Sequence, residues 1–158
     1  KIGNQTWMAE NLAYKPSSGN YWAYGNDNTN VSKYGYLYDW NTAIKVCPTG
    51  WHLPSDSEWT VLEDYLGGRE VAGTKMKSSS GWIHNGNGTN ESGFNAFPGG
   101  CHHYFGEFQS VGSHGSWWSS SEKSASDACR RGLSGNKGDV NNYCVSKALG
   151  YSIRCIKD

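Results

Sequence analysis

Glycines interrupt the second half of the chain so often that it has room for little helix. Glycine occurs 21 times in 158 residues, and after residue 68 it recurs at turn-like intervals, at positions 81, 86, 88, 99, 100, 112 and 115. Closely spaced glycines are typical of the turns in small antiparallel sheets. We therefore expect short strands at residues 100–104, 116–121, 129–133, 141–146 and 152–157.

The first half of the chain carries two helical signals. Apolar residues at three- and four-residue steps predict a first helix over residues 37–46, which must end before Pro48. A second helix is indicated by Ser55 and Glu58, which have the spacing of a capping box, and it should end at Gly67–Gly68.

The remaining segments complete one small α+β domain. Residues 2–7 read as a strand and residues 22–33 as a polar surface loop. A chain of 158 residues suits a single core, and its 8 Trp and 10 Tyr mean that rings must fill much of it. We expect one domain over residues 1–158, excised from a larger secreted or surface protein, since no signal peptide is visible at Lys1.

Charge and hydropathy argue against two classes of partner. Lys plus Arg (14) equals Asp plus Glu (14), so no basic excess attracts nucleic acid or an anionic membrane. The chain also lacks a run of roughly 20 apolar residues, so we expect no membrane insertion.

The five cysteines indicate disulfides and an oxidising, extracellular compartment. They include no CxxC pair and no Cys/His cluster with zinc spacing, which argues against a metal site. A hairpin centred between Asn136 and Lys137 would place Cys129 directly opposite Cys144. Closing a loop of that length is worth roughly 3 kcal/mol in the chain-entropy model.

Cys101 is left over in this pairing. A nucleophilic thiol is the functional alternative, since His102 and His103 follow it and a nearby base lowers the pKa of a thiol. Neighbouring residues on a strand point to opposite faces, however, so His102 would face away and His103 would be displaced along the strand. We expect a buried or incidental free cysteine.

Six sequence blocks link the chain to a known family. In order they are IGNQTWMAENL, YGYLYDW, CPTGWHLPSDSEW, GWIHNGNGTNESGFNAFPGG, GSWWSSSE and GYSIRCIKD. Together they resemble the Fibrobacter succinogenes major paralogous domain family over essentially the whole chain. The resemblance implies a divergent C-type-lectin-like fold, with two helices packed on a small twisted antiparallel sheet and termini close together. It also implies a secreted or surface-exposed bacterial protein, from a family without a single established activity.

The resemblance further implies one disulfide. A cysteine before Pro-x-Gly-Trp, here Cys47, and one in the terminal Arg-Cys-[IV], here Cys155, look like the long disulfide of C-type-lectin-like domains. A loop of that length would be worth about 4–5 kcal/mol. Cys101, Cys129 and Cys144 are additions to this pattern, so Cys101 could compete for either hairpin cysteine.

Polar and aromatic residues in the second half of the chain are the candidates for ligand binding. Loops on a rigid scaffold concentrate binding residues, and C-type-lectin-like folds build their ligand surface from this half. Asn and Arg hydrogen-bond to sugar hydroxyls, and Tyr and Trp rings stack on sugars, so a polysaccharide or glycan is the expected ligand. The candidates are Trp82, His84, His102, His103, Tyr104, Arg130, Arg131, Asn141, Asn142 and Tyr143.

Two other functions are weighed against glycan binding. A protein-binding adhesin at the cell surface would expose an apolar patch of several hundred Å². A carbohydrate-active enzyme would need two carboxylates roughly 5–10 Å apart across a cleft. No motif selects such a pair from Glu107, Glu122, Asp127 and Asp139, so we expect a non-catalytic module.

Calcium is the one cofactor with some support in the sequence. Asp139, Asn141 and Asn142 form an oxygen-rich cluster that is similar to the calcium-coordinating strand of sugar-binding C-type lectins. The companion Glu-Pro-Asn or Gln-Pro-Asp motif is absent, so we expect no metal and no cofactor.

Three further conspicuous residues are assigned to structure or left without a role. Trp117 and Trp118 could form a sugar-stacking platform, but at least one of two neighbours on a strand must point inward, so we expect core packing. His52 has no visible partner in the sequence.

Overall fold

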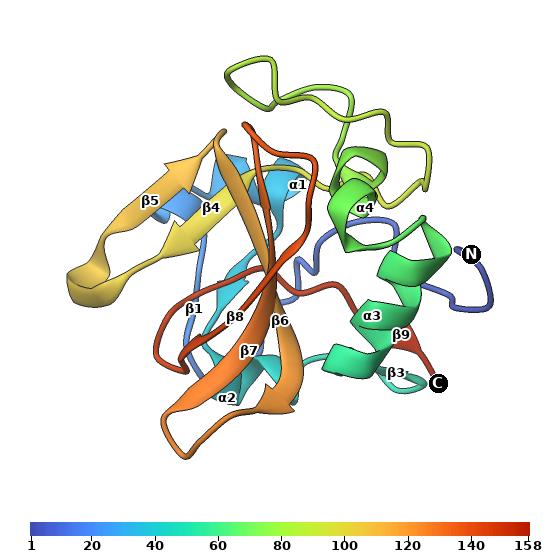
Figure 1. Ribbon diagram of the computed structural model, residues 1–158. Coiled ribbons are helices and arrows are strands. Elements are labelled where there is room, and N and C mark those ends of the chain that lie inside the picture. Colours follow the sequence, from blue (N-terminus) through green and yellow to red (C-terminus); the bar gives the residue numbers. More distant parts are fainter.

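The computed structural model describes residues 1–158 and has a mixed α+β architecture with few, short helices. A five-stranded sheet has the order β5-β4-β6-β7-β8, and two two-stranded sheets pair β1 with β2 and β3 with β9. In Figure 1, α3 and α4 lie on one side of β6, β7 and β8, while the β4–β5 hairpin projects on the other side.

The helices are α1 (Val31–Tyr34), α2 (Trp40–Ala43), α3 (Asp56–Tyr65) and α4 (Arg69–Met76), with short 3-10 turns at Tyr24–Asn26, Asn28–Asn30 and Tyr104–Gly106. The strands are β1 (Tyr21–Trp22), β2 (Leu37–Tyr38), β3 (Trp51–His52), β4 (Gly99–His102), β5 (Phe108–Val111), β6 (His114–Glu122), β7 (Asp127–Ser134), β8 (Asn141–Ser146) and β9 (Ile156–Lys157).

The predicted second helix is confirmed as α3, together with its capping box. The Ser55 hydroxyl accepts a hydrogen bond from the backbone N–H of Glu58, and the Glu58 carboxylate accepts one from the backbone N–H of Ser55. Gly67 and Gly68 adopt positive φ angles of 102° and 96°, which end the helix. The chain then enters α4, a helix that the sequence did not predict.

The predicted first helix over residues 37–46 is confirmed only at Trp40–Ala43, which form α2, and its predicted bounds are wrong. Leu37 and Tyr38 form strand β2, and helix α2 begins only after Asp39, whose carboxylate accepts from the backbone N–H of Thr42. Residues 36–40 are all buried, so this segment is covered on every side. The apolar residues in this segment have helical spacing because the segment is buried on several sides, and not because they form one face of a helix.

The strand predictions are accurate for β6, β7 and β8 and fail in β5 and in the C-terminal segment. The range 141–146 coincides with β8, and the ranges 116–121 and 129–133 lie within β6 and β7. The range 152–157 is mostly wrong, because only Ile156–Lys157 forms a strand and Tyr151 and Ser152 make isolated bridges. Strand β5 was not predicted, and Tyr104 lies beyond the end of β4.

Strand β6 separates two aromatic cores. Trp117 is fully buried in a cluster with Trp59 and Phe94, whereas Trp118 is fully buried in a second cluster with Tyr151. Consecutive residues of a strand point to opposite faces, so one dipeptide supplies a ring to each core. The expected core packing of both tryptophans is confirmed.

Two disulfides and the chain ends close the fold. Cys129 pairs with Cys144 across the β7–β8 hairpin, as the register predicts, and Cys47 pairs with Cys155. Cys101 carries a free thiol. The two termini lie on the same side of the molecule in Figure 1. No helix has the length and apolar character needed to cross a membrane.

His52 has partners after all, which corrects the sequence-based view. Its Nδ1 lies 2.6 Å from Asp158 Oδ1, and its Nε2 lies 2.7 Å from Glu58 Oε1. The sequence could not show this, because strand β3 brings His52 to the C-terminal segment only when it pairs with β9.

Candidate functional site

The ten predicted ligand-binding residues do not form one site, and two of them are buried. Trp82 is 5% exposed, and its indole N–H donates to Ser78 Oγ at 3.1 Å and to the Ala96 carbonyl at 3.0 Å. Its ring belongs to the same core as Trp117. Trp82 therefore fills the interior and cannot stack on an external sugar.

Arg131 is the second correction, since it is 3% exposed. Its guanidinium donates to Glu63 Oε1 at 2.6 Å and to Asp56 Oδ1 at 2.9 Å, so it fastens α3 onto β7. Asn142 joins this network by donating to Asp56 Oδ2 at 3.1 Å. Both carboxylates and the burial of Arg131 leave its guanidinium inaccessible to an external ligand, so we assign this residue to the structure.

Three predicted residues meet on the opposite face of the β7–β8 hairpin. Arg130 Nη1 donates to Asn141 Oδ1 at 2.9 Å, and the guanidinium lies 5.5 Å from the Tyr143 ring centroid and 5.4 Å from that of Tyr151. Arg130 has no carboxylate partner, and its buried Nε has no hydrogen-bond partner. This face therefore has unused donor capacity beside an exposed tyrosine ring.

His102, His103 and Tyr104 lie along the β4–β5 hairpin. The His102 ring stacks on Trp22, with centroids 3.8 Å apart and planes within 7°. Burial, and secondarily the charge of His103, lower the pKa of His102, so this ring is neutral at physiological pH. The hairpin tip carries Phe105, which is completely exposed.

A hollow of about 320 Å³ lies beside this stacked pair, on β1 and the segment that follows it. We call it the aromatic groove. Its lining residues are Lys15, Tyr21, Trp22, Ala23, Asn26, Asn28 and Tyr36. Tyr21 and Trp22 are half-buried, and the Tyr21 ring meets the Tyr36 ring edge-on with centroids 5.2 Å apart.

Sequence reasoning missed the aromatic groove. The sequence predicts a polar surface loop over residues 22–33, and Asn26 and Asn28 of this segment line the same hollow as the rings of Tyr21 and Tyr36. Tyr36 also donates a hydrogen bond to Asn28 Oδ1 at 3.4 Å. The alternation of Tyr36 and Tyr38 near the Tyr21–Trp22 pair was the available signal, because cross-strand aromatic pairing is typical of strands.

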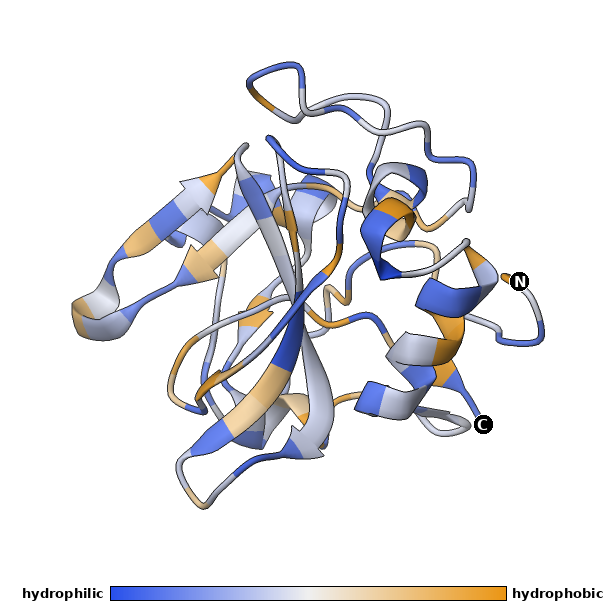
Figure 2. Cartoon of the chain, viewed as in Figure 1, coloured by the Kyte–Doolittle hydropathy of each residue, from blue (hydrophilic) through white to orange (hydrophobic).

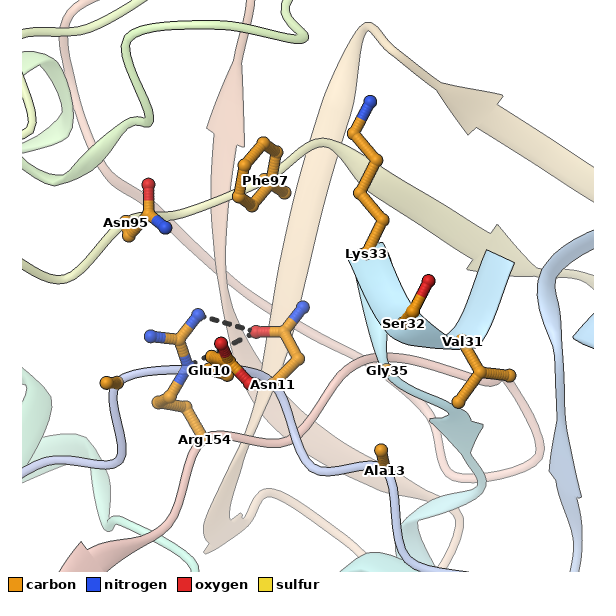
Figure 3. A pocket seen from close by; sticks show the side chains of 11 residues that line it. Glu10, Asn11, Ala13, Val31, Ser32, Lys33, Gly35, Asn95, Phe97 and Arg154 are labelled. Carbon is orange, nitrogen blue, oxygen red and sulfur yellow. Dashed lines mark hydrogen bonds between the residues drawn. The ribbon is translucent and has the colours of Figure 1, made fainter. Parts of the chain in front are cut away.

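Figure 3 shows a second hollow, of about 390 Å³, around Arg154. Arg154 is 1% exposed and donates through Nε and Nη2 to Asn11 Oδ1, at 3.2 and 2.8 Å. The same Asn11 oxygen accepts from Trp117 Nε1 at 2.8 Å. Burial lowers the pKa of Arg154 to about 9, against the opposing charge of Glu10. The N–H groups of this guanidinium donate to Asn11 and to neighbouring backbone carbonyls, so we assign Arg154 to the core.

Family membership follows from a comparison of the whole sequence. Residues 1–157 match the model of the Fibrobacter succinogenes major domain. The chain belongs to this family. No curated protein and no solved structure matches it. In this Fibrobacter succinogenes major domain, four of the six sequence blocks contribute to the hollow around Arg154, through Asn11, Gly35, Phe97 and Arg154 itself.

Two observations on this Fibrobacter succinogenes major domain concern metal-binding side chains and the Cys101 thiol. No group of three or more His, Cys, Asp or Glu side chains is placed to hold a metal ion. Burial raises the pKa of the Cys101 thiol, and the opposing effects of Arg130 and of a hydrogen bond with Gln109 are smaller. His102 stacks on Trp22. The thiol is therefore poorly ionised.

Proposed function

We propose that this Fibrobacter succinogenes major domain is a non-catalytic binding module that recognises a polysaccharide or glycan through the aromatic groove. The observation that carries the proposal is the combination of half-buried Tyr21 and Trp22 with the exposed amides of Asn26 and Asn28. Aromatic rings pack against the C–H faces of pyranose sugars, and amides exchange hydrogen bonds with hydroxyl groups. The stack on His102 holds the Trp22 ring in one orientation, which reduces the entropy lost on binding.

The setting proposed for this module is the bacterial surface or the extracellular space, in a divergent C-type-lectin-like fold. Two disulfides support an oxidising compartment. The disulfide between Cys47 and Cys155, which are 108 residues apart, and the position of the termini support the fold assignment.

The test combines a glycan array with pull-down on insoluble polysaccharides, each with and without EDTA. In a positive array, Tyr21→Ala and Asn28→Ala should each weaken binding about tenfold, equivalent to ~1.4 kcal/mol. Tyr65→Ala is the matched control, because Tyr65 is 64% exposed on α3 and lies outside the groove. EDTA should have no effect.

Two outcomes would contradict glycan binding at the groove. The first is no retention on any polysaccharide by the wild-type domain. The second is equal retention by Tyr21→Ala and Tyr65→Ala. Release of reducing sugars from a retained polysaccharide would instead identify an enzyme.

A protein-binding adhesin is the second candidate, favoured by Phe105. This residue is completely exposed and adopts a left-handed backbone with φ of 65°, at the tip of a projecting hairpin. A bulky residue in that conformation is strained, and such strain concentrates at functional sites. Loss of a defined protein interaction in Phe105→Ser, with polysaccharide retention absent in the wild type, would favour this function.

A further inference from the structure

A third hollow, of about 400 Å³, lies where the end of α4, residues 84–87 and the β7–β8 loop come together. We call it the loop pocket. No hydrophobic side chain lines it. Its lining residues are Thr74, Lys77, His84, Asn85, Gly86, Asn87, Gly135, Asn136, Lys137 and Gly138. It shares no residue with the aromatic groove.

The loop pocket has only basic ionisable groups. Lys77, His84 and Lys137 line it, and no Asp or Glu does. None of the ion pairs in the molecule involves these three residues. Asp139 is the acidic group that acts electrostatically on Lys77, but it forms no ion pair with it and does not line the pocket. The ionisable groups that line the pocket are therefore basic, and none of them is paired with a carboxylate.

Lys77 is the buried member of this group, with 4% exposure. Its ammonium donates to the carbonyls of Ser134 at 3.1 Å and of Lys137 at 2.8 Å. An ammonium has three N–H donors, so one makes no hydrogen bond, and the ammonium lies 5.3 Å from the centroid of the Trp82 ring. A buried charge held only by neutral groups is costly, and burial accordingly lowers the pKa of Lys77, against a smaller effect of Asp139. A negative group in the pocket would offset that cost.

Two amides on the rim can add neutral donors. Asn87 Oδ1 accepts from the backbone N–H of Trp82 at 3.0 Å, and Asn136 Oδ1 accepts from Ser134 Oγ at 2.6 Å. Both side-chain oxygens already accept hydrogen bonds, and the two NH₂ groups remain as donors for a ligand.

The pocket walls are fixed by close backbone contact. A Cβ atom at Gly86 would collide with the backbone of Gly135, and the N–H of Thr74 donates to the Gly138 carbonyl at 3.0 Å. His84 and Asn85 both hold positive φ angles, of 58° and 57°. Such preorganisation favours binding of a small group of fixed shape.

We propose that the loop pocket binds an oxyanion: a carboxylate, phosphate or sulfate group. Lys77 and Lys137 supply positive charge, and the His84 ring and the amides of Asn87 and Asn136 supply further N–H donors. This site does not depend on glycan binding at the aromatic groove.

The test is a titration of the ¹⁵N-labelled domain followed by NMR, at constant ionic strength set with chloride. The probes are inorganic phosphate, sulfate and a uronate monosaccharide, with the neutral hexose of the same configuration as control. We expect saturable shifts of the Gly86, Gly135 and Asn136 amides with at least one anion and none with the hexose. A preference for the uronate would identify an acidic saccharide as the source, and a preference for phosphate or sulfate an inorganic or esterified group.

Exposed residues provide the variants, so folding is preserved. Lys137→Gln should weaken the anion affinity about fivefold, as expected for one exposed charge. Lys123→Gln removes an exposed lysine outside the pocket and should leave the affinity unchanged. The proposal is overturned by the absence of saturable shifts with all three anions, or by equal affinities in Lys137→Gln and Lys123→Gln.

Discussion

His52 shows how one side chain can couple two distant segments. It contacts Glu58 in the capping box of α3 and Asp158 at the C-terminal residue. Burial disfavours its charged form, but hydrogen bonds and the charges of both carboxylates outweigh burial and raise the pKa of His52. For Glu58, burial opposes ionisation, yet bonds from Ser55 and His52 lower its pKa. Both shifts favour the ion pair in the folded state.

The first prediction concerns pH. The pKa of His52 is higher in the folded state than in the unfolded state. Its contribution to stability is therefore complete below the unfolded pKa of about 6.5 and is lost as the pH rises through the folded pKa. The Glu58 contribution is present above about pH 4.5 and is lost as the pH falls through its lowered folded value. The contact should therefore stabilise most between about pH 4.5 and 6.5.

Thermal or urea unfolding across pH 4–9 measures this effect. Between pH 6 and 8.5, the free energy of unfolding of the wild type should fall by up to about 1 kcal/mol more than that of His52→Gln. The difference is small because the two side chains are partly exposed. Identical pH dependence in the two proteins would show that His52 does not couple the segments.

At the level of elements, prediction succeeded where one local signal determines the structure. Ser55 and Glu58 define the start of α3, and the loop at residues 134–138 defines the β7–β8 register. Prediction failed where contacts between residues far apart in the sequence determine the structure. Tyr38 lies in a strand because it pairs with Tyr21 of β1. Position 73 in α4 requires glycine, because a Cβ there would collide with the backbone of Gly138.

The second prediction concerns the β7–β8 hairpin. Replacing Cys129 and Cys144 together with Ala should lower the free energy of unfolding by roughly 3 kcal/mol, since the disulfide closes a loop of 15 residues. Chemical denaturation measures this change. A double variant as stable as the wild type would show that hairpin pairing needs no covalent support.

At the scale of the whole molecule, the candidate site could not be predicted as a set. The aromatic groove combines Tyr21, Asn28 and Tyr36, which meet only after β1 pairs with β2. The predicted hairpin register, with Cys129 opposite Cys144, is confirmed, and it places Arg130 opposite Tyr143. Sequence reasoning placed Arg131 among exposed residues, since alternation along a strand does not show which face a helix will cover.

The third prediction concerns the long disulfide. Replacing Cys47 and Cys155 with Ala should cost about 4–5 kcal/mol, more than loss of the hairpin disulfide, because the closed loop spans 108 residues. The same denaturation experiment compares the two double variants. A smaller loss for the Cys47 and Cys155 pair than for the hairpin pair would contradict this ranking.

The Cys47–Cys155 bond also determines how the domain responds to mechanical force. When the chain is pulled at its two ends, tension passes from Cys47 to Cys155 through the sulfur atoms and bypasses the residues between them. Only the segments outside the bond can lengthen, starting where Met8 and Leu12 pair with the C-terminal segment. Of the three hollows, only the loop pocket lies wholly within the bypassed region, whereas every lining residue of the aromatic groove lies outside it. The loop pocket, which lies wholly inside, would keep its shape under load until the disulfide is reduced.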